Sequence, residues 1–201
     1  MTSSTLRTEA SLMQEVRKSR FLARAARADD AAAAAAFIAR ASEREATHNC
    51  WAWRIGGQYR FNDDGEPGGS AGRPILAAID GQGFDRVAVV VTRWFGGVKL
   101  GVGGLVRAYG GCAAECLRLA ERVALVERVR ARIDCAYAEA PLLYSRLADF
   151  GAERVGDDAT ADGMVVTVSV ARERCDDLSA FVRDLTRGRG RCRIETGDIA
   201  P

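Results

Sequence analysis

The chain has 201 residues, of which 48% are hydrophobic and 28% are charged, and its formal net charge at pH 7 is +2. This length and composition are typical of one or two globular domains with a buried core, and they exclude a chain that is mainly disordered. The sequence lacks the run of about 18 to 20 uncharged apolar residues that a membrane span needs, and its polar start lacks the apolar core of a signal peptide. We therefore expect a soluble, cytoplasmic protein that does not bind membranes.

The basic residues and the cysteines narrow the function classes further. All of the 29 basic residues except Lys18 and Lys99 are arginine. A net charge of +2 is too small to indicate nucleic-acid binding by itself. The cysteines lack the paired spacing of zinc sites and small disulfide scaffolds, so we expect them to be reduced and buried. They are Cys50, Cys112, Cys116, Cys135, Cys175 and Cys192.

The first part of the chain alternates between strand and helix patterns. An alanine-rich run after Asp29 and Asp30 predicts a capped helix, and the β-branched run 86–94 predicts a central strand. Gly56 and Gly57 separate two short strands, as in a hairpin. The expected elements are a strand over 18–27, a helix ending near 41, strands over 47–55 and 59–62, a helix over 75–79, a strand over 86–94 and a helix over 104–119.

The charge balance indicates a boundary near residue 120. Residues 1–120 carry 16 basic and 12 acidic side chains, a net +4, whereas the rest carry 13 and 15, a net −2. We therefore expect two domains, 1–122 and 126–201. The second domain has the order βαββαβ, with elements over 128–136, 141–150, 152–156, 164–170, 176–185 and 191–195. This order predicts a ferredoxin-like antiparallel sheet with its helices on one side, and an α+β fold class overall.

A glycine-rich acidic loop over 63–74 is the first candidate site. Its carboxylates Asp63, Asp64 and Glu66 could hold Mg²⁺ or act as general acid and base, and Ser70 and His48 could complete a pocket with them. Alternatively, the acidic residues simply favour turns and the glycines let the loop fold back on its neighbours. The EF-hand spacing is absent, so we assign no metal site.

Two pairs of potentially reactive or metal-binding side chains are closely spaced in the sequence. His48 and Cys50 lie two residues apart on a strand and face the same side, but no third residue is apparent that would orient the pair for nucleophilic catalysis. A structural or pocket-lining role is the simpler interpretation. Cys112 and Cys116 lie one helical turn apart, and two thiols alone do not make a zinc site. We therefore expect them to pack in the core.

A second glycine-rich segment, 89–109, runs from a strand through a loop into a helix. Backbone N–H groups and the positive end of the helix converge there, as an anion site requires. The cations expected to bind the anion are Arg93, Lys99 and Arg107, together with Arg73 of the preceding loop. The loop glycines of this site are Gly96, Gly97, Gly101, Gly103 and Gly104. The segment matches neither a Walker A loop nor a Rossmann fingerprint, and the alternative is a tight connection in which glycine packs against glycine.

Arginines alternate along two strands of the second domain. Period two places each set on one face of its strand, and the first and last strands of a ferredoxin-like sheet are neighbours. The two rows would form a basic face that tracks phosphates with little sequence preference, because it lacks aromatic side chains. A solvated face partly neutralised by Asp134 and Glu195 is the alternative. The rows are Arg128, Arg130 and Arg132, and Arg187, Arg189, Arg191 and Arg193.

Four segments together resemble the IMPACT/YigZ family. They are KSRF at 18–21, HNCWAW at 48–53, DDGEPGGSAGRP at 63–74 and VVVTRWFGGVKLGVGGLVRAY at 89–109. Ser70 stands where the family usually has threonine, and Trp94 where it more often has tyrosine. The resemblance implies an N-terminal α/β sandwich like domain two of ribosomal protein S-five, followed by a ferredoxin-like domain similar to domain V of elongation factor G.

The resemblance also implies a role in translation, because the eukaryotic relatives regulate it by competing for the activator of an initiation-factor kinase. It implies no reaction and no cofactor. Our leading hypothesis is a non-enzymatic protein that binds nucleic acid or the ribosome. One alternative is a Mg²⁺-dependent enzyme acting on a phosphate-containing small molecule, which requires two carboxylates of the acidic loop to converge on one point. The other is an adaptor for a translation-related protein.

Overall fold

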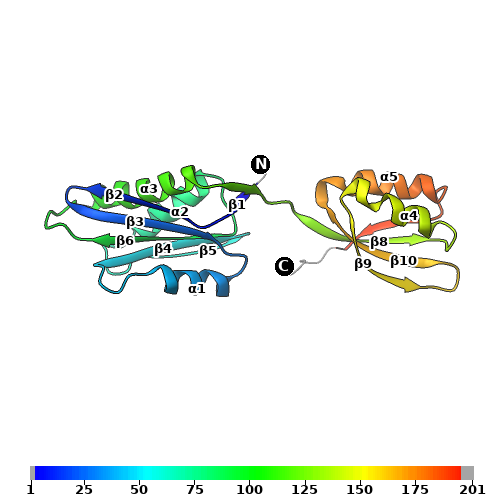
Figure 1. Ribbon diagram of the computed structural model, residues 1–201, viewed down its shortest axis with the longest axis horizontal. Coiled ribbons are helices and arrows are strands. Elements are labelled where there is room, and N and C mark those ends of the chain that lie inside the picture. Colours follow the sequence, from blue (N-terminus) through cyan, green and yellow to red (C-terminus); the bar gives the residue numbers. More distant parts are fainter. Residues whose placement is uncertain (1–2, 196–201) are drawn as a thin grey trace. The chain divides into compact units, whose positions relative to one another are not determined.

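The computed structural model describes residues 3–195, and the chain divides into two compact units, Met1–Leu125 and Val126–Pro201 (Figure 1). Each unit has its own sheet, its own helices and its own buried core. None of the helices formed by residues 3–195 combines the length and the apolar character needed to cross a membrane.

The first unit is built on a five-stranded antiparallel sheet. Its strands, in sheet order, are β2 (Ala10–Val16), β3 (Ser19–Arg27), β6 (Val87–Trp94), β4 (His48–Ile55) and β5 (Gln58–Asn62). A separate two-stranded sheet pairs β1 (Ser4–Leu6) with β7 (Arg122–Ala124). The predicted strands over 18–27, 47–55, 59–62 and 86–94 all form.

Helices cover both faces of the five-stranded sheet (Figure 1). Helix α1 (Ala31–Ala41) lies on one face, and α2 (Gly72–Gly81) and α3 (Val102–Leu119) lie on the other. Residues of β6 therefore pack alternately into two cores: Val89 and Val91 face α2 and α3, whereas Ala88 and Val90 face α1. A strand that is buried on both faces needs apolar side chains on both, which is why residues 87–91 of β6 form an unbroken apolar run.

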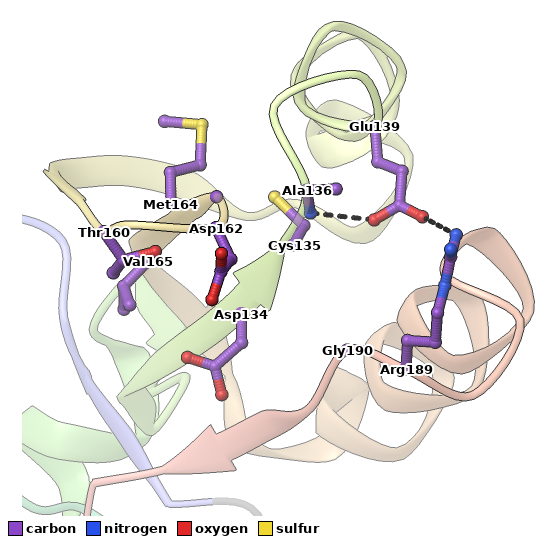
Figure 2. Close-up of a pocket in the computed structure, with 11 residues that line it drawn as sticks. Asp134, Cys135, Ala136, Glu139, Thr160, Asp162, Met164, Val165, Arg189 and Gly190 are labelled. Atoms are coloured by element: carbon purple, nitrogen blue, oxygen red, sulfur yellow. Dashed lines mark hydrogen bonds and ion pairs between the residues drawn. The ribbon is translucent and has the colours of Figure 1, made fainter.

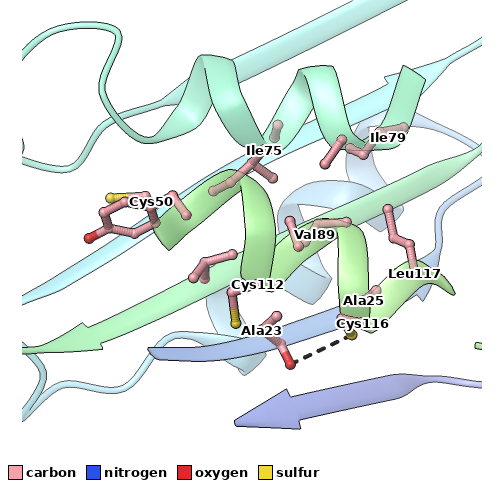
Figure 3. Packing of buried hydrophobic residues seen from close by; sticks show 14 of the residues in the cluster. Ala23, Ala25, Cys50, Ile75, Ile79, Val89, Cys112, Cys116 and Leu117 are labelled. Atoms are coloured by element: carbon pink, nitrogen blue, oxygen red, sulfur yellow. Dashed lines mark hydrogen bonds between the residues drawn. The ribbon is translucent and has the colours of Figure 1, made fainter. Parts of the chain in front are cut away.

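Helix α3 has core residues at helical spacing, as predicted. Figure 3 shows Cys112, Cys116 and Leu117 of α3 packed with residues of α2 and of the sheet, and the Cys116 thiol lies 3.9 Å from the Ala23 carbonyl oxygen. Burial raises the pKa of Cys112 to about 11 and that of Cys116 to about 12. All six cysteines are free thiols, five of them buried and Cys192 half-buried.

The second unit has the predicted ferredoxin-like topology. Its strands are β8 (Arg128–Cys135), β9 (Glu153–Ala159), β10 (Met164–Ala171) and β11 (Cys192–Ile194), in the sheet order β11-β8-β10-β9. Helix α4 (Ala140–Arg146), continued by the 3₁₀-helix η1 (Leu147–Phe150), and helix α5 (Cys175–Leu185), preceded by η2 (Arg172–Arg174), pack on one face of the sheet. The α+β fold class is confirmed.

Several parts of the chain differ from the sequence-based expectation, and the short strands β1 and β7 are among the elements that were not predicted. The strand β2 was not predicted either, because Gln14 on its inward face and Met13 on its outward face interrupt its alternation. The predicted arginine row leading into the last strand is wrong in part. Only Arg193 lies in β11, whereas Arg187 and Arg189 lie in the turn after α5, where Arg187 has a φ of 53°.

Gly96 holds two segments of the first unit together. It follows β6 and lies against the turn between β2 and β3. A Cβ atom at this position would stand 1.9 Å from the carbonyl oxygen of Lys18. Only glycine allows this approach of two backbones, so this glycine of the predicted anion loop has a packing role.

We predict that Gly96→Ala lowers the free energy of unfolding of the first unit by about 2 to 3 kcal/mol, because the Lys18 backbone must shift to admit the methyl group. Chemical denaturation followed by Trp fluorescence would measure the loss, since all three Trp residues lie in this unit. Gly111→Ala is the matched control. An added Cβ meets nothing at this α3 position, and alanine should stabilise the helix there by about 0.5 to 1 kcal/mol. Equal stability of the Gly96→Ala variant and the unsubstituted chain would contradict the packing role.

Candidate functional site

A buried ion pair joins the two glycine-rich segments. Glu66 of the acidic loop accepts a hydrogen bond from Nη1 of Arg93, on β6, at 2.6 Å. The two side chains are only 3% and 6% exposed. The same Glu66 Oε1 atom accepts a second hydrogen bond from the Tyr109 hydroxyl of α3 at 2.7 Å. One carboxylate therefore ties the acidic loop to the central strand and to the longest helix.

The position of Arg93 corrects one member of the predicted anion site. Arg93 neutralises Glu66, and its guanidinium lies between two aromatic rings, 5.6 Å from the centroid of Phe21 and 5.4 Å from that of Phe95. Its Nη2 atom lies 3.4 Å from the Ser19 hydroxyl. A ligand anion would have to displace Glu66 to reach Arg93, so we assign Arg93 a structural role and not a ligand-binding one.

The carboxylates of the acidic loop bond to different partners within the protein. Asp63 accepts backbone hydrogen bonds from Gly69, Ala71 and Gly72 at 2.8 to 2.9 Å. Partial burial opposes ionisation of Asp63, but these three N–H groups together lower its pKa below the ordinary value. Asp64 instead accepts a hydrogen bond from the backbone N–H of Asn49 at 2.6 Å.

Each of the three carboxylates thus has a different set of partners inside the protein. Within residues 3–195 no three His, Cys, Asp or Glu side chains are grouped so as to hold a metal ion. The Mg²⁺-dependent enzyme required two of these carboxylates to be free to meet at one ion. In the structure each is bonded to backbone N–H groups or to Arg93, which disfavours that alternative.

His48 and Cys50 take part in the same loop contacts. The Nδ1 atom of His48 lies 2.7 Å from the Asp64 carbonyl oxygen, which can only accept, so Nδ1 carries the proton. Its Nε2 atom lies 3.8 Å from Glu66. The Cys50 thiol donates to the Asp63 carbonyl oxygen at 3.0 Å, and burial raises the pKa of the thiol to about 12. Cys50 is therefore protonated and structural rather than nucleophilic.

Ser70, the remaining member of the candidate pocket, is fully buried. Its hydroxyl oxygen has no hydrogen-bond partner among the residues that the structure describes. The residues singled out around the acidic loop therefore do come together, as an interlocked cluster in which Glu66 and Ser70 are buried and Asp64 is exposed.

The exposed cations gather beside this cluster. Lys99 and Arg107 are exposed, as expected, and the turn between β2 and β3 adds exposed Arg17 and Lys18. Arg17 and Arg107 line one hollow of about 300 Å³ with Leu100 and Gly104, among others. None of these four cations forms an ion pair with any residue between 3 and 195. Together with exposed Phe95 they form what we call the loop–turn surface.

Of the other predicted members of the anion site, the glycines shape the backbone before and at the start of α3, whereas Arg73 lies apart from the hollow. Gly101 has a φ of 72° and precedes α3 without a side-chain cap, and Gly103 and Gly104 form the first turn of that helix. Gly97 also has a positive φ, 84°. Arg73 is exposed at the second residue of α2 and does not line the hollow. Arg17 and Lys18 were not assigned to the anion site from the sequence because the strand before them was not recognised, although Ala10, Leu12 and Val16 pack on the core.

The arginine face of the second unit is largely neutralised. Arg132 and Arg193 are register partners on neighbouring strands, as predicted. Arg132 lies 3.6 Å from Asp158, and Arg193 lies 3.5 Å from Asp134. Arg128 is likewise occupied, because it donates to Ser169. Three arginines of the two rows are exposed and form no ion pair with a described residue: Arg130, Arg187 and Arg191.

One end of the second sheet carries an acidic hollow of about 380 Å³ (Figure 2). Its carboxylates are Asp134, Asp162 and Glu139. Figure 2 shows Glu139 between its two partners, the backbone N–H of Ala136 at 2.9 Å and Arg189 at 2.8 Å. Arg189, expected on the basic face, is therefore paired beside this hollow. The excess of carboxylates disfavours phosphate there.

We predict that Glu66→Gln destabilises the first unit by about 3 kcal/mol, because the substitution keeps the shape of the side chain but leaves the Arg93 charge buried without a counter-ion. Denaturant unfolding would measure the change. Glu115→Gln, which breaks an exposed pair with Arg118, is the control and should leave the free energy of unfolding nearly unchanged. Equal effects of the two substitutions would refute a structural role for the buried pair.

Comparison with known proteins places the chain in a family. The family model of the Impact N-terminal domain matches residues 17–117. An IMPACT family member of Thermus thermophilus is 59% identical over 114 residues, which cover 57% of this chain and 63% of that one. The Escherichia coli family member YigZ is 34% identical over 184 residues, covering 88% of this chain and 90% of that one.

A solved structure shares the whole architecture. The crystal structure of a hypothetical protein, 32% identical in sequence, superposes with a TM-score of 0.72 and covers 98% of this chain and 100% of its own. The match to the family model and the full-length similarity to YigZ agree, and the chain belongs to the IMPACT family.

Proposed function

We propose that this protein binds RNA through the loop–turn surface, without catalysing a reaction, and that it acts in translation. One observation carries the proposal. Four exposed cations, Arg17, Lys18, Lys99 and Arg107, surround the glycine loop and the start of α3, and none is neutralised by a described residue. Unpaired cations grouped on one surface bind phosphate groups and release their counter-ions.

The backbone contributes to the same surface. The first N–H groups of α3 follow the uncapped Gly101, so they and the positive end of the helix are available to an anion. Gly103 and Gly104 are partly or fully exposed and have no bulky side chain between the backbone and a ligand. A phosphate chain could thus contact side-chain and backbone donors together.

The second unit is a weaker candidate for the primary contact. Four of its seven predicted arginines are bonded to carboxylates or to Ser169, and an acidic hollow lies at one end of its sheet. Arg130, Arg187 and Arg191 remain available to phosphates on the second unit itself. This arrangement favours an accessory role for the second unit.

The state of the candidate catalytic groups supports binding rather than catalysis. The loop carboxylates bond to backbone N–H groups or to Arg93, and the Cys50 thiol is protonated. The link to translation rests on the family resemblance of the motifs. Ribosomal RNA is the abundant RNA that is accessible to a protein acting in translation.

We predict that the double substitution Lys99→Ala, Arg107→Ala weakens RNA binding at low salt by at least about 10-fold. Fluorescence anisotropy with a labelled RNA oligonucleotide over a series of salt concentrations would measure it. The slope of log K against log salt should become shallower by about 1.4, because about 0.7 is lost for each phosphate contact with a single strand.

Arg60→Ala is the control, because Arg60 is an exposed arginine on the edge strand β5, away from the β2–β3 turn. It should leave both affinity and slope unchanged. Ribosome co-sedimentation provides a second measurement, with the same variants. If the unsubstituted protein binds neither the oligonucleotide nor ribosomes at low salt, RNA binding is disproved. A partner that is retained from a lysate after nuclease treatment would favour the adaptor instead.

A further inference from the structure

Phe95 carries an exposed aromatic ring that lies next to the guanidinium of a buried arginine. The residue is 47% exposed, yet the guanidinium of buried Arg93 lies 5.4 Å from its ring centroid. Arg93 is itself held by Glu66 at 2.6 Å, and its guanidinium also lies 5.6 Å from the ring centroid of Phe21. The Phe95 ring thus lies next to a cation that the protein holds in place, while about half of the residue stays exposed.

The backbone at Phe95 is fixed as well. Its N–H donates to the hydroxyl of Thr47 at 3.0 Å. The next N–H, at Gly96, donates to the Ser19 hydroxyl at 3.1 Å, and Gly96 packs directly on the Lys18 backbone. A ring held by its backbone and by a neighbouring cation loses little conformational freedom when a ligand binds.

The neighbouring aromatic ring is not open in this way. Trp94 is half-buried, and the guanidinium of Arg20 lies 5.0 Å from its ring centroid. Phe95 is therefore the ring of the loop–turn surface that offers an uncovered area. Lys18 lies against Gly96, next to this ring, and Lys99 follows it by four residues in the same loop. Two cations that form no ion pair with residues 3–195 are thus close to the ring, Lys99 in the sequence and Lys18 through the contact of its backbone with Gly96.

We propose that Phe95 is a base-stacking platform, so that the loop–turn surface selects single-stranded over double-stranded RNA. An unpaired base can place its face on the ring while the flanking cations contact the phosphates on either side. A duplex hides its base faces in the stack and could use only the cations. The inference rests on the proposed function and names the class of RNA that the site binds.

Substitution of Phe95 tests this selectivity. The probes are an unstructured RNA of about 12 nucleotides and a duplex of the same length, in one low-salt buffer. The unsubstituted protein should bind the single strand more tightly. Phe95→Leu should weaken single-strand binding by about 10-fold or more and leave duplex binding unchanged, whereas Phe95→Trp should retain the preference. Phe61→Leu, at an exposed phenylalanine of β5, is the matched control and should change neither affinity.

The outcomes separate this inference from the proposed function. If the unsubstituted protein binds neither RNA, the proposed function fails whatever Phe95 does. If it binds RNA and Phe95→Leu keeps the full single-strand affinity, the platform is overturned while RNA binding stands. If Phe95→Leu weakens both RNAs equally, Phe95 only shapes the loop, which also overturns the platform. Thermal unfolding of each variant shows that the first unit is folded in the binding assay.

Discussion

The ion pair between Glu66 and Arg93 is the interaction on which the rest of the first unit depends. A guanidinium at this position on β6 is buried, so it requires a carboxylate close by. Glu66 supplies that carboxylate from a loop 27 residues earlier, and Tyr109 completes the contact from α3. The pair thereby connects the acidic loop, the central strand and the long helix, and it also supports the exposed ring of Phe95.

This pair also explains why two segments rich in charge and glycine do not form a catalytic cleft. Opposite charges on facing loops can bind a ligand between them only if they remain apart. Here the opposite charges of Glu66 and Arg93 neutralise each other inside the protein, and Asp63 and Asp64 serve as acceptors for backbone N–H groups. Binding capacity therefore lies with the cations that have no such partner, at the edge of the buried cluster.

Periodicity predicted the parts of the fold that are set by burial. The apolar run of β6, the core spacing of α3 and the order of the second unit could all be derived from it, because each reflects which faces are covered. Strand β2 could not, because Gln14 on its inward face and exposed Met13 on its outward face interrupt the alternation of apolar and polar residues. The burial of Arg93 could not be predicted either, since its partner Glu66 is distant in sequence and an arginine near the end of a strand is equally compatible with exposure. The arginine row ending in Arg193 failed because alternation has a meaning only within a strand, and Arg187 lies in a turn.

The net charge of +2 conceals two different uses of arginine. On the second unit most arginines of the sheet face have acidic neighbours, so their fields cancel at short range. On the loop–turn surface four cations form no ion pair with any residue from 3 to 195. Salt screens exposed charges beyond about 8 to 10 Å, so such a protein has little long-range attraction for RNA. Because the surface carries only these four cations, it can contact few phosphates at once. Specific affinity must then come from short-range contacts, and a fixed aromatic ring among unpaired cations is the feature of this surface that supplies one.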